Sequence, residues 1–136
     1  MQNRDLLYIE IYNKIQKASN ILILTHINPD GDCLGASNAL SIFLNSINKK
    51  NSILVNIIIP ENLKFLDINN AVYDYNDNYD LFIMLDANNI KRCGYNGTIN
   101  DFDLIIFDHH KDLEGCYEKA LKIIDESSSS TCEIIF

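Results

Sequence analysis

The sequence lacks the excess of basic residues that nucleic-acid-binding proteins carry. It has 11 Lys and Arg against 19 Asp and Glu, which gives a formal net charge of −8, and its sequence pI is near 4.6. Proteins that bind duplex nucleic acid use a basic surface to displace counterions, so this composition argues against a duplex partner. If the substrate is a nucleic acid, we expect it to be short. A carboxylate-rich site that holds cations accounts for part of the acidity.

The sequence also lacks paired cysteines and long apolar runs. Its four cysteines, Cys33, Cys93, Cys116 and Cys132, include no Cys-x-x-Cys pair, so neither a zinc knuckle nor a dithiol redox motif is indicated. This spacing favours reduced thiols in a cytosol. No apolar run approaches the roughly 20 residues that span a bilayer, and no signal segment is recognisable. We therefore expect a soluble, cytoplasmic protein without a membrane partner.

What the sequence does contain is ordinary globular composition, with 47% hydrophobic and 22% charged residues. Apolar residues at helical spacing predict helices over 4–19 and 34–47, with a short helix near 63–66. Short apolar runs predict strands over 21–24, 53–59, 81–85 and 104–107. A strand, helix, strand order implies parallel pairing through a right-handed crossover. We expect an α/β fold with a mostly parallel sheet of four or five strands and helices on both faces.

The stretch ILILTHINPDGDC, residues 21–33, combines a buried strand with a possible metal site. His26, Asp30 and Asp32 follow the strand, and Gly31 between the aspartates favours a sharp turn. Asp32 is also placed to cap the helix that begins near Cys33. One imidazole and two carboxylates form a mixed N and O ligand set suited to manganese, magnesium or zinc. The alternative is an ordinary surface loop with a helix cap.

Two later strands also end in residues of the types that bind metals. Asp86 follows the strand over 81–85, and Asp108, His109 and His110 follow the strand over 104–107. In an open parallel sheet, ligands bind outside the carboxyl ends of the strands, so these side chains should converge with His26. Taken singly, Asp86 could be a cap and the histidines a loop pair. Together they favour a shared site.

The order H-x-x-x-D-x-D, then a lone Asp, then D-H-H resembles the DHH phosphoesterase superfamily. With SSSSTCEII, residues 127–135, the stretch HINPDGDCLGAS is most similar to the branch of bifunctional oligoribonucleases and pAp phosphatases. The resemblance implies a metal-dependent hydrolase that uses two Mn²⁺ ions, with Mg²⁺ or Co²⁺ as possible substitutes. It extends from residue 21 to residue 136.

The resemblance also assigns roles to the matching residues. His26, Asp30 and Asp86 would hold one metal ion, while Asp32, Asp86 and His109 would hold the second, so that Asp86 bridges them. His110 would face the phosphate and donate a hydrogen bond to its developing charge. Asp108 would hold an imidazole by accepting its other ring N–H, unless it is simply a strand-end cap.

Two parts of the family pattern have no match. The aspartate of the fourth motif is missing, and Asp125 lies in the wrong position to replace it. The glycine-rich C-terminal accessory domain is also missing. Residues 127–130 could form a linker or a phosphate-contacting loop, but Ser129 or Ser130 as the cap of a helix over 131–136 is favoured. We expect residues 1–136 to be the N-terminal part of a DHH domain in a longer protein.

The expected function is manganese-dependent hydrolysis of short single-stranded oligoribonucleotides, of 3′-phosphoadenosine 5′-phosphate, or of both. A cyclic dinucleotide phosphodiesterase or a pyrophosphatase with the same metal core is an alternative, and so is a catalytically incomplete fragment that binds metal or nucleotide. A response-regulator-like domain also has acidic residues at its strand ends, but it has no use for His26, His109 and His110. The resemblance also allows a homodimer and implies an accessory domain in the full-length protein.

Overall fold

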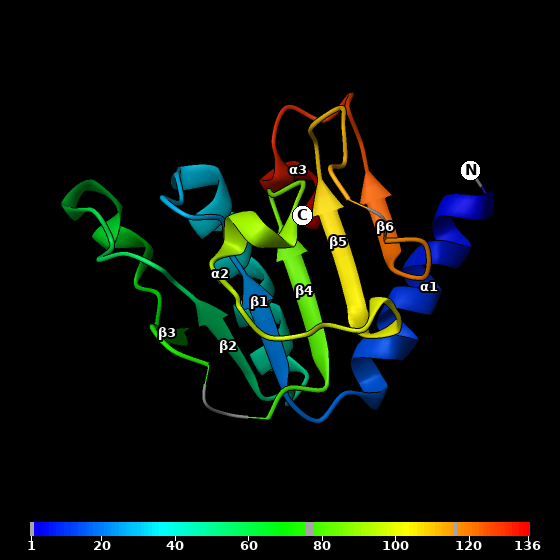
Figure 1. The fold of residues 1–136 in the computed structure, drawn as a ribbon, viewed down its shortest axis with the longest axis horizontal. Helices are drawn as coiled ribbons and strands as arrows, with labels where there is room; N and C mark the ends of the chain where they lie inside the picture. Colours follow the sequence, from blue (N-terminus) through cyan, green and yellow to red (C-terminus); the bar gives the residue numbers. More distant parts are fainter. Residues whose placement is uncertain (1, 76–77, 116) are drawn as a thin grey trace.

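A six-stranded parallel sheet forms the centre of the computed structural model, which describes residues 2–75, 78–115 and 117–136 (Figure 1). The strand order is β3-β2-β1-β4-β5-β6, and every pairing is parallel. The strands are β1 Ile21–Leu24, β2 Asn51–Leu54, β3 Ala71–Val72, β4 Leu81–Leu85, β5 Leu104–Asp108 and β6 Leu121–Ile124. The α-helices are α1 Gln2–Lys17, α2 Gly31–Ser46 and α3 Thr131–Ile135, and the 3₁₀ helices are η1 Glu61–Leu66, η2 Ile90–Cys93 and η3 Asp101–Asp103.

The predicted α/β fold with a parallel sheet is confirmed, but the sheet has six strands instead of four or five. The strand predicted over 53–59 ends at Leu54. Val55 still donates a hydrogen bond to Val72 O, and then the chain leaves the sheet, because the Asn56 side chain bonds to Cys93 O. The two missed strands are short edge strands, and β3 has only two residues.

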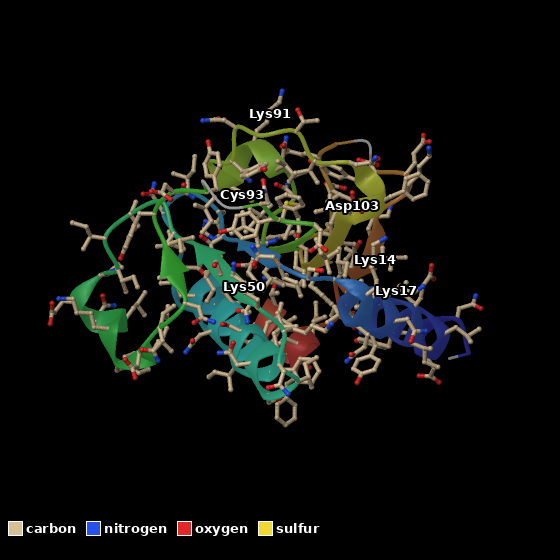
Figure 2. The ribbon with its side chains drawn as sticks, turned by 90° about the horizontal axis from the view of Figure 1, so that it is seen from below. Lys14, Lys17, Lys50, Lys91, Cys93 and Asp103 are labelled. Carbon is tan, nitrogen blue, oxygen red and sulfur yellow. The ribbon has the colours of Figure 1, made fainter. Side chains whose placement is uncertain are left out.

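Alternating side chains of each strand divide the core between the two faces of the sheet. Ile21 and Ile23 of β1 pack in one cluster with α1, α2 and α3. Leu22 and Leu24 pack in a second cluster, which η2 and several tyrosine-rich loops cover. Helical segments therefore lie on both faces, as expected, but all three α-helices lie on one of them (Figure 2).

The strand order places the functional edge of the sheet. From β1 the chain moves outward to β2 and β3, and then returns to add β4 on the other side of β1. Ligands bind at such a reversal of strand order, at the carboxyl ends of the strands. Leu24 of β1 is level with Met84 of β4, which is level with Ile106 of β5. The residues that follow these three strands therefore meet at one edge.

Gly94 ends η2 in the left-handed conformation, with φ of 64°. A Cβ at this position would lie 2.5 Å from Asn56 Oδ1, and Asn56 holds the same turn through its bond to Cys93 O. Gly94→Ala is expected to lower the free energy of unfolding by roughly 1–3 kcal/mol in urea denaturation. Gly31→Ala is the control, because a Cβ there would make an ordinary 3.6 Å contact with Leu63 Cδ2. Equal stabilities of the two variants would contradict this account of the turn.

Two further observations concern the cysteines and the membrane. The described cysteines, Cys33, Cys93 and Cys132, form no disulfide with one another, and Cys116 lies outside the described residues. Across residues 2–75, 78–115 and 117–136, no helix has the length and apolar character needed to cross a membrane.

Candidate metal centre

The side chains singled out in the sequence gather at the carboxyl ends of three neighbouring strands. His26 lies in the loop after β1, and Asp86 directly follows β4. Asp108 is the last residue of β5. The full set is His26, Asp30, Asp32, Asp86, Asp108, His109 and His110.

Asp86 is at the centre of this group. Its Oδ2 lies 3.6 Å from His26 Nε2, and its Oδ1 lies 3.4 Å from His109 Nε2. Each carboxylate oxygen therefore faces a different histidine. Asp86 has a φ of 55° and is 5% exposed. Burial, and then the charge of Asp32, raise the pKa of Asp86 to about 6.

Local hydrogen bonding sets the tautomer of His26. Its Nδ1 lies 2.9 Å from Ile27 O, which can only accept a hydrogen bond, so Nδ1 carries the proton. The lone pair of Nε2 then faces Asp86 Oδ2 and, at 3.9 Å, Asp30 Oδ1. A lone pair directed at two carboxylates is unfavourable unless a proton or a cation lies between them.

The helix cap predicted for Asp32 is wrong, because Asp30 takes that role. Asp30 Oδ1 accepts from Cys33 N at 2.9 Å and begins α2. Gly31 is the first helical residue and makes no special turn, while Asn28 has the positive φ, at 57°. Asp32 instead points away from its own helix end toward a distant part of the chain.

The carboxylate of Asp32 accepts hydrogen bonds from the first two backbone N–H groups of α3. Its Oδ2 accepts from Thr131 N and its Oδ1 from Cys132 N, both at 2.9 Å. Burial raises the pKa of the Asp32 carboxyl, but these two hydrogen bonds outweigh burial and hold the pKa below its usual range. Asp32 Oδ2 also lies 3.7 Å from His109 Nε2. The carboxylate is thus fixed in its charged form beside His109.

Asp108 and His110 form a separate pair beside Asp86. Asp108 is buried, and its Oδ1 lies 2.6 Å from His110 Nδ1. The same oxygen accepts from His109 N at 2.9 Å. The hydrogen bond to Asp108 raises the pKa of the His110 imidazole. Asp108 therefore contacts the histidine that was predicted to face the phosphate.

The C-terminal serine-rich segment contributes a residue that sequence reasoning missed. Thr131 Oγ1 donates to Asp86 Oδ1 at 3.0 Å, and Thr131 is fully buried. Ser130 caps α3 as predicted, with its side chain accepting from Glu133 N at 3.2 Å. Asp125, which was considered as a replacement for the missing aspartate of the fourth motif, instead forms an ion pair with Arg4 at 2.9 Å.

A cleft of about 450 Å³ opens beside these side chains. One part of its lining comes from His26, Asp30, Asp86 and His110. Ile27, Asn28 and Ala87 also line it, and so do three polar residues that the sequence analysis did not single out: Asn88, Lys91 and Arg92. The sequence pattern that could have indicated these residues is the adjacent Lys-Arg pair that follows a strand and its terminal aspartate.

The chain is similar to known proteins over most of its length. It matches the DHH family, N-terminal domain, over residues 20–136. A curated relative from Streptococcus mutans, described as a probable bifunctional oligoribonuclease and PAP phosphatase NrnA, is 30% identical over 125 residues, which cover 92% of this chain and 40% of the relative. The crystal structure of an exopolyphosphatase-related protein from Bacteroides fragilis matches with a TM-score of 0.82 at 27% identity, over 97% of this chain and 42% of that one. The chain thus spans about two fifths of the length of these relatives.

Proposed function

Because the chain belongs to the DHH family, as its match over residues 20–136 shows, we propose that it holds the metal centre of a manganese-dependent phosphoesterase. The proposed substrates are short oligoribonucleotides, 3′-phosphoadenosine 5′-phosphate, or both, because the Streptococcus mutans relative bears the name of an oligoribonuclease and PAP phosphatase. Since the chain spans 40% of that relative, a C-terminal accessory domain in the whole protein is part of the proposal.

The observation that carries the proposal is the position of Asp86 between two histidines. One of its oxygens faces His26 Nε2 and the other faces His109 Nε2, so the carboxylate would be able to serve two cations at once. His26, Asp30 and Asp86 would hold one ion. Asp32, Asp86 and His109 would hold the other. This donor set of imidazole nitrogens and carboxylate oxygens fits Mn²⁺, Mg²⁺ or Co²⁺.

The charges of these side chains, as well as their donor atoms, favour bound metal cations. The carboxylates of Asp30, Asp32 and Asp86 converge on the two imidazoles, and Asp86 is buried where its own negative charge is costly. His26 presents a lone pair to this group, because its other nitrogen is committed to Ile27 O. When bound, two cations supply a shared water of lowered pKa and stabilise the charge that develops on phosphorus.

His110 is proposed to bind the scissile phosphate beside the metal ligands. It lines the cleft, and its Nδ1 donates to Asp108, so its Nε2 donates to a phosphate only when the ring is an imidazolium. The raised pKa of His110 favours the imidazolium, the form in which Nε2 carries a proton that it can donate to a phosphate oxygen. Asp108 would thus act through His110, by orienting it.

The test is manganese binding together with turnover, measured on the purified chain with a five-nucleotide RNA and with 3′-phosphoadenosine 5′-phosphate. We expect two Mn²⁺ per chain in titration calorimetry. His109→Ala is expected to lose one ion and its turnover. His110→Ala is the matched comparison, and it should keep both ions while turnover falls roughly 10²- to 10³-fold, as for loss of one transition-state donor.

Different failures point to different parts of the proposal. Absence of Mn²⁺ binding would overturn the metal centre itself. Binding of one ion without turnover would favour the alternative of an incomplete metal-binding fragment, whose activity needs the rest of the protein. Turnover of a cyclic dinucleotide or pyrophosphate in preference to both substrates would keep the metal centre and reject the substrate.

A further inference from the structure

The cleft beside the metal centre has a basic part that the proposed chemistry does not use. Among the described residues that line it, Lys91 and Arg92 are the only lysine and arginine, and both are exposed. In the described part of the chain, neither is paired with a carboxylate, although acidic residues outnumber basic ones by 19 to 11. Figure 2 shows Lys91 on η2, across the sheet from Lys14 and Lys17 of α1. Two uncompensated positive charges therefore face a cleft whose acidic lining residues are Asp30 and Asp86.

The backbone of Lys91 and Arg92 is hydrogen-bonded to the residue that follows His26. Ile27 N donates to Arg92 O at 2.5 Å, and Ile27 O accepts from His26 Nδ1. The same residue therefore orients the histidine and holds η2 beside it. On the other side of the turn, Asn56 Nδ2 donates to Cys93 O at 2.7 Å, and Cys93 is buried. The turn that carries Lys91 and Arg92 is thus fixed relative to His26.

The guanidinium of Arg92 is also positioned. Its Nη1 donates to Asn88 Oδ1 at 3.2 Å, and Asn88 Nδ2 donates to Asp112 O at 3.1 Å. Asn88 lies two residues after Asp86, so it belongs to the segment that follows β4. A guanidinium held by a neutral amide keeps its full charge and most of its donors for a ligand.

We propose that Lys91 and Arg92 form a subsite for a second phosphate group of the substrate, one that is not hydrolysed. The inference rests on the proposed function, because the scissile phosphate is taken to lie among His26, Asp86 and His110, which line the same cleft. A ligand with one phosphate can satisfy only the metal centre. A ligand with a second phosphate across a ribose also neutralises the basic pair, through charge-assisted hydrogen bonds that Arg can make in bidentate form.

The subsite makes the protein selective for bisphosphates over monophosphates. A second phosphate can be an ester, as in 3′-phosphoadenosine 5′-phosphate, or part of an anhydride, as in tripolyphosphate. The two share the charge that the pair recognises, but only the ester places its phosphates a sugar apart. Because the proposed substrates are nucleotides, we expect the ester to bind more tightly, and tripolyphosphate tests the other source.

The experiment is binding to the full chain in Mn²⁺, measured by rapid mixing before turnover, with 3′-phosphoadenosine 5′-phosphate, adenosine 3′-monophosphate and tripolyphosphate as ligands. Lys91→Ala/Arg92→Ala is expected to weaken the bisphosphate roughly 10- to 100-fold, the usual cost of losing charge-assisted hydrogen bonds. The monophosphate should change less than about 3-fold, because its only contacts are at the metal centre. Lys17→Ala, an exposed lysine of α1 outside the cleft, is the control and should bind all ligands as the unmodified chain does.

Charge reversal in Lys91→Glu/Arg92→Glu is the second variant. It should reverse the preference, so that the monophosphate binds more tightly than the bisphosphate, and added salt should reduce the difference. An unchanged preference in both variants, or no preference in the unmodified chain, would overturn the subsite. Loss of Mn²⁺ binding in the unmodified chain would instead overturn the proposed function. Tighter binding of tripolyphosphate would reject the sugar-spaced ligand.

Discussion

Replacing Asp86 by asparagine is expected to remove at least one of the two Mn²⁺ ions and to lower turnover by at least roughly 10³-fold. The reason is the position of the carboxylate, since one oxygen faces His26 and the other faces His109. Asparagine has nearly the same size and keeps an oxygen that can accept from Thr131 Oγ1, so the fold should persist. What it loses is the negative charge and the second oxygen that a bridging ligand requires.

The measurements for this variant are Mn²⁺ stoichiometry by titration calorimetry and turnover of 3′-phosphoadenosine 5′-phosphate. Asp103→Asn is the matched control, because Asp103 is an exposed aspartate of η3, at the opposite end of β5 from the candidate site. It should bind and turn over like the unmodified chain. Retention of two ions by Asp86→Asn would show that Asp86 does not bridge, and each ion would then need separate ligands.

The sequence predicted the parts of the fold that depend on local pattern. Strands β1, β4 and β5 are short apolar runs buried on both faces, and their ends were placed to within one residue. Strand β6, with sequence LKII, is half-buried at the edge of the sheet and has no such run. Strand β3 is two residues long, too short for any periodicity. Edge strands depend on their neighbours more than on their own residues.

The candidate site shows the same division between local and distant contacts. Residues next to strand ends converge because the parallel sheet aligns those ends, which the sequence order alone predicts. Asp32 looked like a helix cap because the residue that satisfies it, Thr131, is 99 positions away. The contact of Thr131 with Asp86 was missed for the same reason. Long-range hydrogen bonds leave no trace in local spacing.

These long-range bonds also explain how the chain holds its carboxylates together. The N-terminus of α3 compensates the charge of Asp32 with two N–H groups, whereas the hydroxyl of Thr131 is the one hydrogen-bond donor to the Asp86 carboxylate among the described residues. The pKa of Asp32 is accordingly lowered and that of Asp86 is raised. Asp86 is thus the carboxylate whose ionisation most depends on a bound cation.

Without metal, the protein is therefore expected to lose stability as the pH rises from about 4 to about 7. The pKa of Asp86 is about 6 in the folded chain, whereas the ordinary pKa of a free aspartate side chain is 3.8. Between these values the folded state binds more protons than the unfolded state, so each step up in pH favours unfolding. The difference of about two pH units corresponds to a loss of about 3 kcal/mol across this range.

Other shifted groups do not reverse this trend. The lowered pKa of Asp32 adds stability only as the pH rises toward 4, and that gain is complete before the loss from Asp86 develops. The raised pKa of His110 acts in the same direction as Asp86, since its stabilisation is lost as the pH rises above 6.5. The exposed ring of His110 makes its contribution the smaller one.

Urea denaturation in EDTA at several pH values measures this loss, with Asp86→Asn as the comparison. The free energy of unfolding of the variant should change little between about pH 4.5 and 6.5. At about pH 7.5 it should exceed that of the unmodified chain by about 3 kcal/mol. Parallel curves for the two proteins would contradict the role assigned to Asp86. Saturating Mn²⁺ should raise the stability of the unmodified chain at about pH 7.5 and leave the variant less affected, because binding to the folded state alone stabilises it. The buried charge that destabilises the empty site would then be the one that makes metal binding favourable.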